Sequence, residues 1–435
     1  MEKKLKILVC PPNYGGCGQY RVVQPMQKLE EKFPNDVDIR FDDDPLGWST
    51  EDPHSFTFDN IKWADVVFTA NIHKYGGEYT LNLARVSKEL GKFYHFDTDD
   101  LLTELYEGHR HYQAYKDNNL ENITKAVYGM ADLVSVTQMK FAERVAQYVQ
   151  SGCLAVIKNA IDFDLPCWNM PPVKAKKGHT RIGWVGGIHH EEDVKPFHGV
   201  MLSLAAKVGA ENVEWRLHGK PPPNADNDKE GWQQDVWKNY EAWLTSGAKK
   251  SNVFVGYALP SDKYGVFYSQ MDISIAPLLD NPFNDSKSEI KLMECGRYGL
   301  PLVCTDVGAY SEVIENGKTG YLISKNNPKS EWIQRLTKLC KDPDHRREMG
   351  QNLKKVVDER YNSNLHIGDR LKIYHELIKQ KKEYLEALKN VEKEKRNTET
   401  VQEEAGNREP LESEGRGCVQ GREVPQQGED EAERS

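Results

Sequence analysis

Short apolar runs rich in β-branched residues alternate with segments of helical periodicity along most of the 435-residue chain. The runs include LKILVCP, ADVVFTA, KFYHFDT and ADLVSVT in the first half, and RIGWVGG, VEWRLHG, NVFVGY, DISIAPL and PLVCTD in the second. Strands that alternate with helices favour βαβ units and a parallel sheet. The alternation breaks at the Pro- and Lys-rich stretch DLPCWNMPPVKAKKGH, which has the composition of a linker. The sequence therefore predicts an α/β chain with two tandem Rossmann-like domains.

The boundaries of the predicted domains follow from where this pattern stops. We place the first domain at residues 1–165 and the second at residues 176–360. Apolar residues at helical spacing then predict a long C-terminal helix over residues 361–396. Residues 397–435 are mostly Glu, Gly, Arg, Gln and Pro, and a segment this polar cannot bury enough apolar surface to offset its ordering entropy. We predict that this tail is disordered.

Composition argues against several classes of protein. The formal net charge of -9 disfavours a protein that holds nucleic acid by bulk electrostatics, and leaves room only for a local basic groove. The eight cysteines form no CxxC pair, so the spacing indicates neither a zinc site nor a disulfide framework, and a reducing cytoplasm fits best. No apolar run is long enough to span a membrane, and the run after MEKK is too short for a signal peptide. We expect a cytoplasmic protein without an integral membrane segment.

The segment NDSKSEIKLMECGRYGLPLVCTDVG, residues 284–308, joins a polar start to an apolar continuation. Ser286 and Glu289 have the spacing of a capping box, so we expect a helix to begin near Lys287. Gly299, followed by a proline, should end it.

On such a helix Lys287, Lys291 and Glu294 would share one face. The preceding run DISIAPL would deliver the segment to the carboxyl edge of the sheet, where ligands bind in doubly wound folds. Amides at a helix start and two ammonium groups suit a diphosphate, and a carboxylate further along suits a ribose diol. The alternative is a surface helix with a solvated Lys-Lys-Glu stripe.

Residues 291–323, KLMECGRYGLPLVCTDVGAYSEVIENGKTGYLI, resemble the donor-nucleotide segment of retaining glycosyltransferases with the GT-B fold. The resemblance is to the glycogen-synthase-like group of the glycosyltransferase group 1 (family 4) superfamily. The usual form is Glu-Ala-Met-x-x-Gly-x-Pro-Val, and Glu294, Gly299, Pro301 and Val303 occupy the matching positions. The resemblance implies that Glu294 contacts the ribose of a nucleotide-sugar donor.

The first acidic residue of that family would fall at Ser286 in this chain. NDSKSEIKLMEC is instead similar to a bacterial and phage subgroup that carries Asn-x-x-Lys-Ser-x-Ile-Lys. This similarity implies that Lys287, Ser288 and Lys291 replace the acid-led loop at the donor. Asn284 and Ser286 are further candidate donor contacts in the same segment.

Glycine-containing loops follow the first strand of each predicted domain. GGCGQYR is similar to the subgroup's Gly-x-x-Tyr-Arg, which implies that Arg21 could stabilise the leaving diphosphate, although a lone glycine loop is more often a turn. GGIHHEED is similar to its Gly-x-x-x-His-x-x-Asp. The candidates in these loops are Gly16, Gly18, Tyr20, Arg21, Gly186, Gly187, His190, Asp193 and Lys195. The His- and Glu-rich run also raises a metal site, but the family fold usually works without one, so we expect neither metal nor cofactor.

Three carboxylates, Asp97, Asp99 and Asp100, end the predicted strand YHFDTDD. One alternative is that they cap the next helix. The other is that they line a cleft where an acceptor hydroxyl sits, and Asp99 and Asp100 are then catalytic candidates. Lys220 and Tyr257 follow later strands, where they are either donor contacts or plain strand ends.

These residues together predict a glycosyltransferase that moves a sugar from a nucleotide-diphosphate sugar, with retention implied by the resemblance. The acceptor is left open among a glycan, a lipid-linked sugar, a protein and a nucleic acid. The alternatives are another nucleotide-sugar enzyme of this fold, such as an epimerase, an inverting transferase or a DNA-base glycosyltransferase, and a non-catalytic ligand-binding or scaffold protein.

Overall fold

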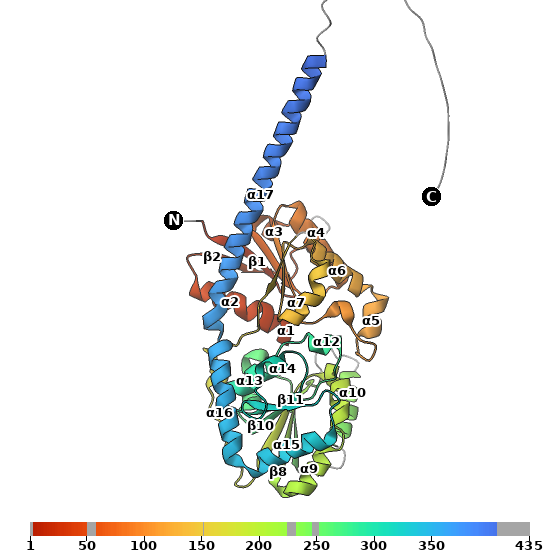
Figure 1. The fold of residues 1–435 in the computed structure, drawn as a ribbon, viewed down its shortest axis with the longest axis vertical. Coiled ribbons are helices and arrows are strands. Elements are labelled where there is room, and N and C mark those ends of the chain that lie inside the picture. Colours follow the sequence, from red (N-terminus) through yellow and green to blue (C-terminus); the bar gives the residue numbers. More distant parts are fainter. Residues whose placement is uncertain (1–2, 50–57, 151, 224–231, 246–251, 407–435) are drawn as a thin grey trace, which may run out of the picture. The chain divides into compact units, whose positions relative to one another are not determined.

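A computed structural model of the chain describes residues 3–49, 58–150, 152–223, 232–245 and 252–406. Within it, Met1–Tyr374 form one compact unit and His375–Ser435 a second. The first unit contains both predicted Rossmann-like domains, coloured red to yellow and green to cyan in Figure 1. Among the described residues, no helix combines the length and apolar character that crossing a membrane requires.

The first domain is built on a six-stranded parallel sheet with the order β2-β1-β3-β4-β5-β6. Its strands are β1 (Leu5–Cys10), β2 (Val37–Phe41), β3 (Val66–Ala70), β4 (Phe93–Asp97), β5 (Leu133–Val136) and β6 (Cys153–Val156). Its helices are α1 (Gly16–Gly18), α2 (Gln24–Lys32), α3 (Asp59–Trp63), α4 (Gly77–Glu89), α5 (Tyr112–Asp117), α6 (Leu120–Met130) and α7 (Met139–Val145). The central strands β3, β4 and β5 are buried along their whole length, as expected for a parallel sheet covered on both faces.

The second domain repeats this plan with a six-stranded sheet in the order β12-β11-β10-β7-β8-β9. Its strands are β7 (Thr180–Val185), β8 (Val213–Lys220), β9 (Val253–Tyr257), β10 (Ile273–Ala276), β11 (Leu302–Thr305) and β12 (Gly320–Ile323). Its helices are α8 (Glu191–Val194), α9 (Val200–Val208), α10 (Trp232–Leu244), α11 (Gly265–Tyr268), α12 (Pro282–Asp285), α13 (Ile290–Arg297), α14 (Ala309–Val313), α15 (Lys329–Lys341) and α16 (Pro343–Arg360). The predicted pair of tandem Rossmann-like domains is confirmed.

Each sheet reverses its strand order once, between β1 and β3 in the first domain and between β7 and β10 in the second. Ligands of doubly wound folds bind outside the carboxyl ends of the strands at such a reversal. The loops after β1, β7 and β10, which carry most of the predicted site residues, all leave from strands at these points.

Helix α17 (Ser363–Gly406) begins where the chain returns from the second domain to the first. The amide of Ile161 donates to the carbonyl of Tyr361 at 2.8 Å, and the amide of Ser363 donates to the carbonyl of Ile161 at 2.9 Å. The Tyr374 hydroxyl lies 2.8 Å from Nδ1 of His95 on β4, which ties the start of the helix to the first sheet. The predicted long C-terminal helix is confirmed.

The boundary predicted for the disordered tail is wrong by several residues. Helix α17 continues past residue 397 to Gly406, over a stretch that contains the good helix formers Glu, Gln and Ala. The rest of the predicted tail, residues 407–435, lies outside the described residues.

Candidate functional site

A cavity of about 340 Å³ lies between the two domains, at the carboxyl edges of both sheets. The first domain lines it with Cys17, Asp100, Leu102, Leu105, Tyr106, His109, His111 and Tyr115. The second domain lines it with Gly187, His189, His190, Asp193, Phe283, Asn284 and Lys287. Polar and aromatic side chains from both domains therefore face one space large enough for a small-molecule substrate.

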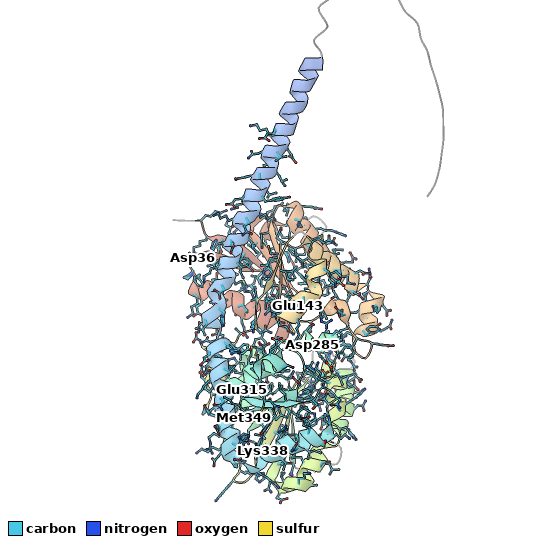
Figure 2. All side chains as sticks on the ribbon, viewed as in Figure 1. Asp36, Glu143, Asp285, Glu315, Lys338 and Met349 are labelled. Atoms are coloured by element: carbon cyan, nitrogen blue, oxygen red, sulfur yellow. The ribbon has the colours of Figure 1, made fainter. Side chains whose placement is uncertain are left out.

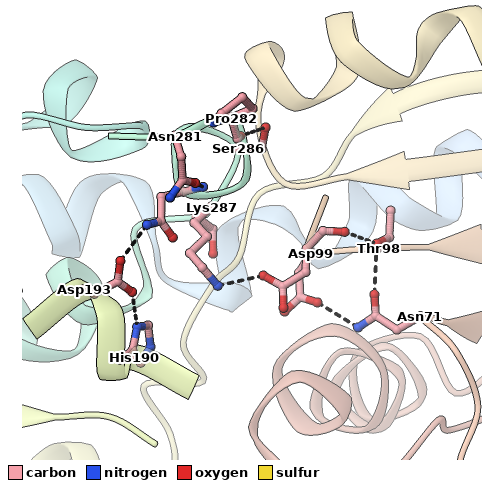
Figure 3. A network of polar contacts seen from close by, with 12 residues as sticks. Asn71, Thr98, Asp99, His190, Asp193, Asn281, Pro282, Ser286 and Lys287 are labelled. Carbon is pink, nitrogen blue, oxygen red and sulfur yellow. Dashed lines mark hydrogen bonds and ion pairs between the residues drawn. The ribbon is translucent and has the colours of Figure 1, made fainter. Parts of the chain in front are cut away.

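A chain of hydrogen bonds on the second-domain side fixes His190. Asp193 accepts from Nδ2 of Asn284 at 2.6 Å and from Nδ1 of His190 at 2.8 Å. Figure 3 shows the contact of Asp193 with His190. Nε2 of His190 then lies 3.4 Å from Nζ of Lys291, whose ammonium group donates to it. Burial, reinforced by Lys291, lowers the pKa of His190 to about 4, so its imidazole is neutral at pH 7.

An ion pair joins the two domains across the cavity. Nζ of Lys287 lies 2.9 Å from Oδ1 of Asp100, and the two side chains are only 22% and 30% exposed. Burial alone would raise the pKa of Asp100, but the ammonium group of Lys287 outweighs it and holds that pKa below its ordinary value. The neighbouring Asp99, held by Nδ2 of Asn71 at 2.8 Å, has a pKa raised by burial and by Asp100. The cleft thus holds one ionised carboxylate beside another that binds a proton more readily.

Glu294 is 2% exposed and both of its carboxylate oxygens are hydrogen-bonded. The Tyr20 hydroxyl of the first domain donates to Oε1 at 2.7 Å, and the Tyr268 hydroxyl donates to Oε2 at 2.6 Å. Burial raises the pKa of Glu294, and the two hydroxyls and Lys291 oppose that rise. The carboxylate lies one helical turn beyond Lys291 on α13, so the predicted common face holds for these two residues.

The comparisons with known proteins agree with this geometry. Residues 179–342, which span β7 to α15, match the family model described as glycosyl transferases group 1. The match covers most of the second domain and none of the first. The second domain contributes Asp193, His190, Lys287, Lys291 and Glu294, so the matched segment supplies the whole second-domain side of the site.

A curated relative aligns with part of the chain. A sucrose synthase from Denitrovibrio acetiphilus is 30% identical over 123 residues, which is 28% of this chain and 14% of that protein. The chain therefore aligns with only a small part of that relative's length.

Two solved structures share the fold along most of the chain. Sucrose-phosphate synthase from Thermosynechococcus elongatus has a TM-score of 0.62 at 15% identity, with 87% of this chain and 100% of that chain covered. HepE from Anabaena, in complex with UDP and glucose, has a TM-score of 0.58 at 13% identity, with 86% and 100% covered. These likenesses establish the GT-B fold for this chain.

The segment that carries the predicted donor residues departs from its predicted structure. The expected helix start at Lys287 and the capping box of Ser286 with Glu289 are wrong. Ser286 Oγ donates back to the carbonyl of Pro282 at 2.9 Å, and Asn281 caps the short helix α12 instead. The carboxylate of Glu289 accepts from the Tyr361 hydroxyl. Because α13 begins at Ile290, Lys287 precedes the helix and does not share its face with Lys291 and Glu294.

The polar residues of this segment are buried because the first domain faces them. Nδ2 of Asn159 donates to Oγ of Ser288 at 2.7 Å. Nε2 of Gln138 donates to the carbonyl of Asp285 at 2.6 Å, and Nζ of Lys140 lies 3.2 Å from Oδ1 of Asp285, the residue labelled between the domains in Figure 2. The alternative of a solvated surface stripe does not hold, since Lys287 and Glu294 also contact the first domain.

Arg21 is not free to meet a diphosphate. It is 1% exposed, and it binds both oxygens of Asp97 at 2.8 and 2.6 Å and the carbonyl of Ile157 at 2.7 Å. A bidentate pair of this kind fixes strand ends, so we assign Arg21 and Asp97 to the scaffold of the first domain. The prediction of Arg21 as a catalytic residue is therefore corrected.

The structure gives different reasons for glycine at the predicted glycine positions. A Cβ at Gly18 would meet the carbonyl oxygen of Asn13 at 2.0 Å, so the chain needs glycine for the tight turn after β1. A Cβ at Gly186 would meet the Trp184 indole at 2.3 Å, which makes this glycine a packing residue. Gly187 lines the cavity, and a Cβ at Gly16 would meet only the Tyr264 hydroxyl, at 3.9 Å. These two positions keep space open beside the cleft.

The remaining predicted donor contacts lie outside the cavity lining. Lys195 is paired with Glu192, and Nζ of Lys220 lies 3.8 Å from Glu241. Tyr257 is 49% exposed at the end of the edge strand β9. The structure does not bring these three side chains to the ion pair of Lys287.

Sequence reasoning missed the aromatic and histidine residues on the first-domain side. Tyr106, His109, His111 and Tyr115 all line the cavity, and the rings of His109 and His189 stack across it with centroids 6.3 Å apart. Burial and Lys287 lower the pKa of His109 to about 4. The dense run YEGHRHYQAY, which follows the acidic strand end after LLTEL, was the available signal.

One group of side chains has metal-ligating atoms close together. Sγ of Cys17 and carboxylate oxygens of Asp99 and Asp100 lie within 4.8 Å of one another. Lys287 contacts Asp100 from the other side at 2.9 Å, so an ammonium group already supplies positive charge there. The absence of a metal remains a prediction.

Proposed function

We propose that this chain is a glycosyltransferase that takes a sugar from a nucleotide-diphosphate sugar and transfers it to an acceptor hydroxyl. The observation that carries the proposal is the Lys287–Asp100 pair, which sets a cation of the glycosyl transferases group 1 domain against a carboxylate of the first domain inside the cavity. The GT-B fold and the UDP in the Anabaena HepE structure support the nucleotide donor.

The donor diphosphate would lie against Lys287 and Lys291. When the bond between the anomeric carbon and the phosphate oxygen breaks, negative charge grows on the leaving diphosphate. Lys287 is cationic at neutral pH, because Asp100 outweighs the burial that would lower its pKa. Neutral His190 accepts from Lys291 and so orients it toward the same region. Glu294, one turn further on α13, would receive the ribose hydroxyls.

The acceptor would enter from the first-domain side, among Tyr106, His109, His111 and Tyr115. Its hydroxyl oxygen forms the new bond to the anomeric carbon, and its proton must leave. Asp100 is the candidate to orient that hydroxyl or take its proton, because its lowered pKa keeps it ionised at neutral pH. Asp99, the preceding residue, is held by Asn71 and would thereby help to fix the position of Asp100.

We further propose that the reaction needs no metal ion or other cofactor and that it retains the configuration of the sugar. The ammonium group of Lys287 takes the place beside Asp100 where a divalent cation would otherwise balance the diphosphate. Retention, and membership of the bacterial and phage subgroup, rest on the resemblance of residues 284–323 to retaining enzymes.

A nucleotide-release assay tests the proposal. The protein is incubated with UDP-glucose, UDP-N-acetylglucosamine, GDP-mannose and ADP-glucose, with and without a mixed set of sugar acceptors and with EDTA in a parallel series. We expect one donor to release its nucleoside diphosphate faster with an acceptor, equally with EDTA, and to give a product with the anomeric configuration of the donor by NMR. Epimerised donor without release would favour an epimerase, and no donor consumed or bound would contradict the proposal.

A further inference from the structure

A second, smaller cavity lies where the chain passes between the domains. Three segments line it: the end of the π-helical turn Gln19–Val23 with the start of α2, the passage at 157–162, and the first turns of α17. The lining residues are Tyr20, Arg21, Gln24, Pro25, Ile157, Lys158, Ala160, Asp162, Ser363, His366, Ile367 and Arg370. It shares none of these with the cavity of the candidate active site, so it is a separate space.

Among the described residues, Arg370 places a buried cation with an unpaired hydrogen-bond donor in the wall of this cavity. The side chain is 4% exposed, and its Nη1 has no hydrogen-bond partner within the described part of the chain. Its guanidinium carbon lies 5.1 Å from the centre of the Phe68 ring, and the group also interacts with the Tyr374 hydroxyl and with the His95 ring. No carboxylate of the described residues lies within ion-pair distance of it. A buried cation with an unused donor is costly unless an acceptor from outside meets it.

Among the charged residues that line the cavity, Arg21, Lys158 and Arg370 are cations and Asp162 is an anion. Arg21 is paired with Asp97 at 2.6 Å, and Asp162 lies 3.2 Å from Nζ of Lys28, which also contacts Asp164 and Glu31. Lys158 is exposed at the rim, and no described carboxylate lies within 4.0 Å of it. The surface between these groups is apolar, formed largely by Pro25, Ile157, Ala160 and Ile367.

We propose that this cavity binds a small amphipathic anion, a carboxylate or phosphate monoester with an apolar body. The anionic head would meet Nη1 of Arg370, and the body would lie against the side chains of Pro25, Ile157 and Ile367. Lys158 would add positive charge at the mouth. A guanidinium suits both head groups because it offers paired donors to either.

Calorimetry and thermal shift on the full-length protein test this site with octanoate and phenyl phosphate, against octanol and benzyl alcohol as neutral partners of the same shape. We expect at least one of the anions to bind and raise the Tm, and neither alcohol to do so. Arg370→Met should weaken that binding by about tenfold or more. Lys158→Glu should weaken it by about threefold, while Lys176→Met, an exposed control, leaves it unchanged.

Several results would overturn the site. These are no binding of either anion, equal binding of an anion and its alcohol, or unchanged anion binding in both Arg370→Met and Lys158→Glu. Lys158→Glu decides the question if Arg370→Met does not fold, since Lys158 is exposed and unpacked. UDP binding measured in the same variants separates this site from the proposed donor site, because we expect it to stay at the wild-type level.

Discussion

Lys287 is the side chain through which the second domain reaches a first-domain carboxylate in the cleft. Its ammonium group lies over the Phe283 ring at 4.4 Å and contacts Asp100 at 2.9 Å. In the proposed reaction its ammonium group faces the leaving diphosphate, and it also lowers the pKa of the neighbouring Asp100 carboxyl. Both roles make it the residue whose replacement should affect turnover most.

Replacing Lys287 with methionine keeps its length and removes its charge. We expect kcat for nucleotide release to fall by about 10²- to 10³-fold, the usual cost of losing one group that stabilises developing charge. Because Lys287 lowers the pKa of Asp100, the acidic limb of the pH–rate profile should move to higher pH. Lys318→Met, at an exposed position, is the matched control, and a kcat within twofold of wild type in Lys287→Met would contradict its role.

Glu294→Gln tests the proposed ribose contact. The amide keeps the shape but loses the charge that two ribose hydroxyls would share, so we expect weaker binding of UDP. We also expect the variant to lose the preference of the wild type for UDP over 2′-deoxy-UDP. Calorimetry measures both, with the exposed Glu315→Gln as control. A preserved preference for UDP would place the ribose elsewhere.

Sequence reasoning singled out second-domain residues that the structure brings together, but it did not predict all of their partners. Motif spacing singled out His190, Asp193, Lys291 and Glu294, and the structure brings the first three into one chain of contacts. It misjudged Arg21, because the buried partner Asp97 lies far away in sequence on another strand. The spacing of residues in a motif predicts neighbours that are close in the sequence. It does not predict a pair that forms only through tertiary packing.

At the scale of elements, the segment from α12 to α13 is the part that local rules described least well. Ser286 and Glu289 fit a capping box, yet Ser286 bonds back to Pro282 and Glu289 turns to Tyr361. A carbonyl of α12 and the hydroxyl of Tyr361, just past the end of α16, take the place of the local cap. The helix end was predictable, since Gly299 adopts a φ of +66° just past Arg297, where glycine is favoured.

Gly308 supports this segment from the next loop. It has a φ of +60°, and a Cβ there would lie 2.8 Å from the carbonyl oxygen of Asn284 and 3.2 Å from that of Asp285. Gly308→Ala should therefore lower the free energy of unfolding by about 1–3 kcal/mol and weaken nucleotide binding, because the loop that carries Lys287 must shift.

Gly178→Ala is the matched control for that substitution. Gly178 also has a positive φ, of +84°, but its Cβ would meet nothing within 4 Å. It should cost some stability through backbone strain and leave nucleotide binding intact. Denaturant unfolding measures the free energy of unfolding, and calorimetry measures nucleotide binding. Equal nucleotide binding by both alanine variants would contradict the role of Gly308 in supporting the loop.

At the scale of the whole molecule, the alternation of strand and helix patterns was enough to predict both sheets, because each buried strand of a parallel sheet is a short apolar run. The contacts at the interface between the two domains were not predictable from the sequence. Contacts such as Asn159 with Ser288 and Tyr20 with Glu294 depend on how two separate cores face each other. The extent of α17 was underestimated, since composition alone does not separate an exposed helix from a disordered chain.

The buried histidines should make stability depend on pH. Burial lowers the pKa of His73, His190 and His218 to about 4 and that of His189 to about 3. Between pH 6.5 and about 4 the unfolded chain therefore binds more protons than the folded chain, so the free energy of unfolding falls as pH falls. The raised pKa values of Asp99 and Glu294 act in the opposite direction, but they involve fewer groups.

We expect the Tm to drop by about 5 °C or more between pH 7.5 and pH 5. His218→Phe removes one of these groups from a site where its ring stacks on Phe267, outside the cleft, and should make the drop smaller. His375→Phe, at an exposed position, should leave the drop unchanged. A Tm that is constant over this range would contradict the buried, neutral state of the histidines.

The most direct test of the central claim is calorimetric binding of UDP, GDP and ADP to the wild-type protein and to Lys287→Met, Lys291→Met and Glu294→Gln. The account predicts that at least one nucleoside diphosphate binds the wild type and that each of the three substitutions weakens it, while Arg370→Met does not. Binding that is absent from the wild type, or equal in all four variants, would show that the helix and loop after β10 do not hold a nucleotide.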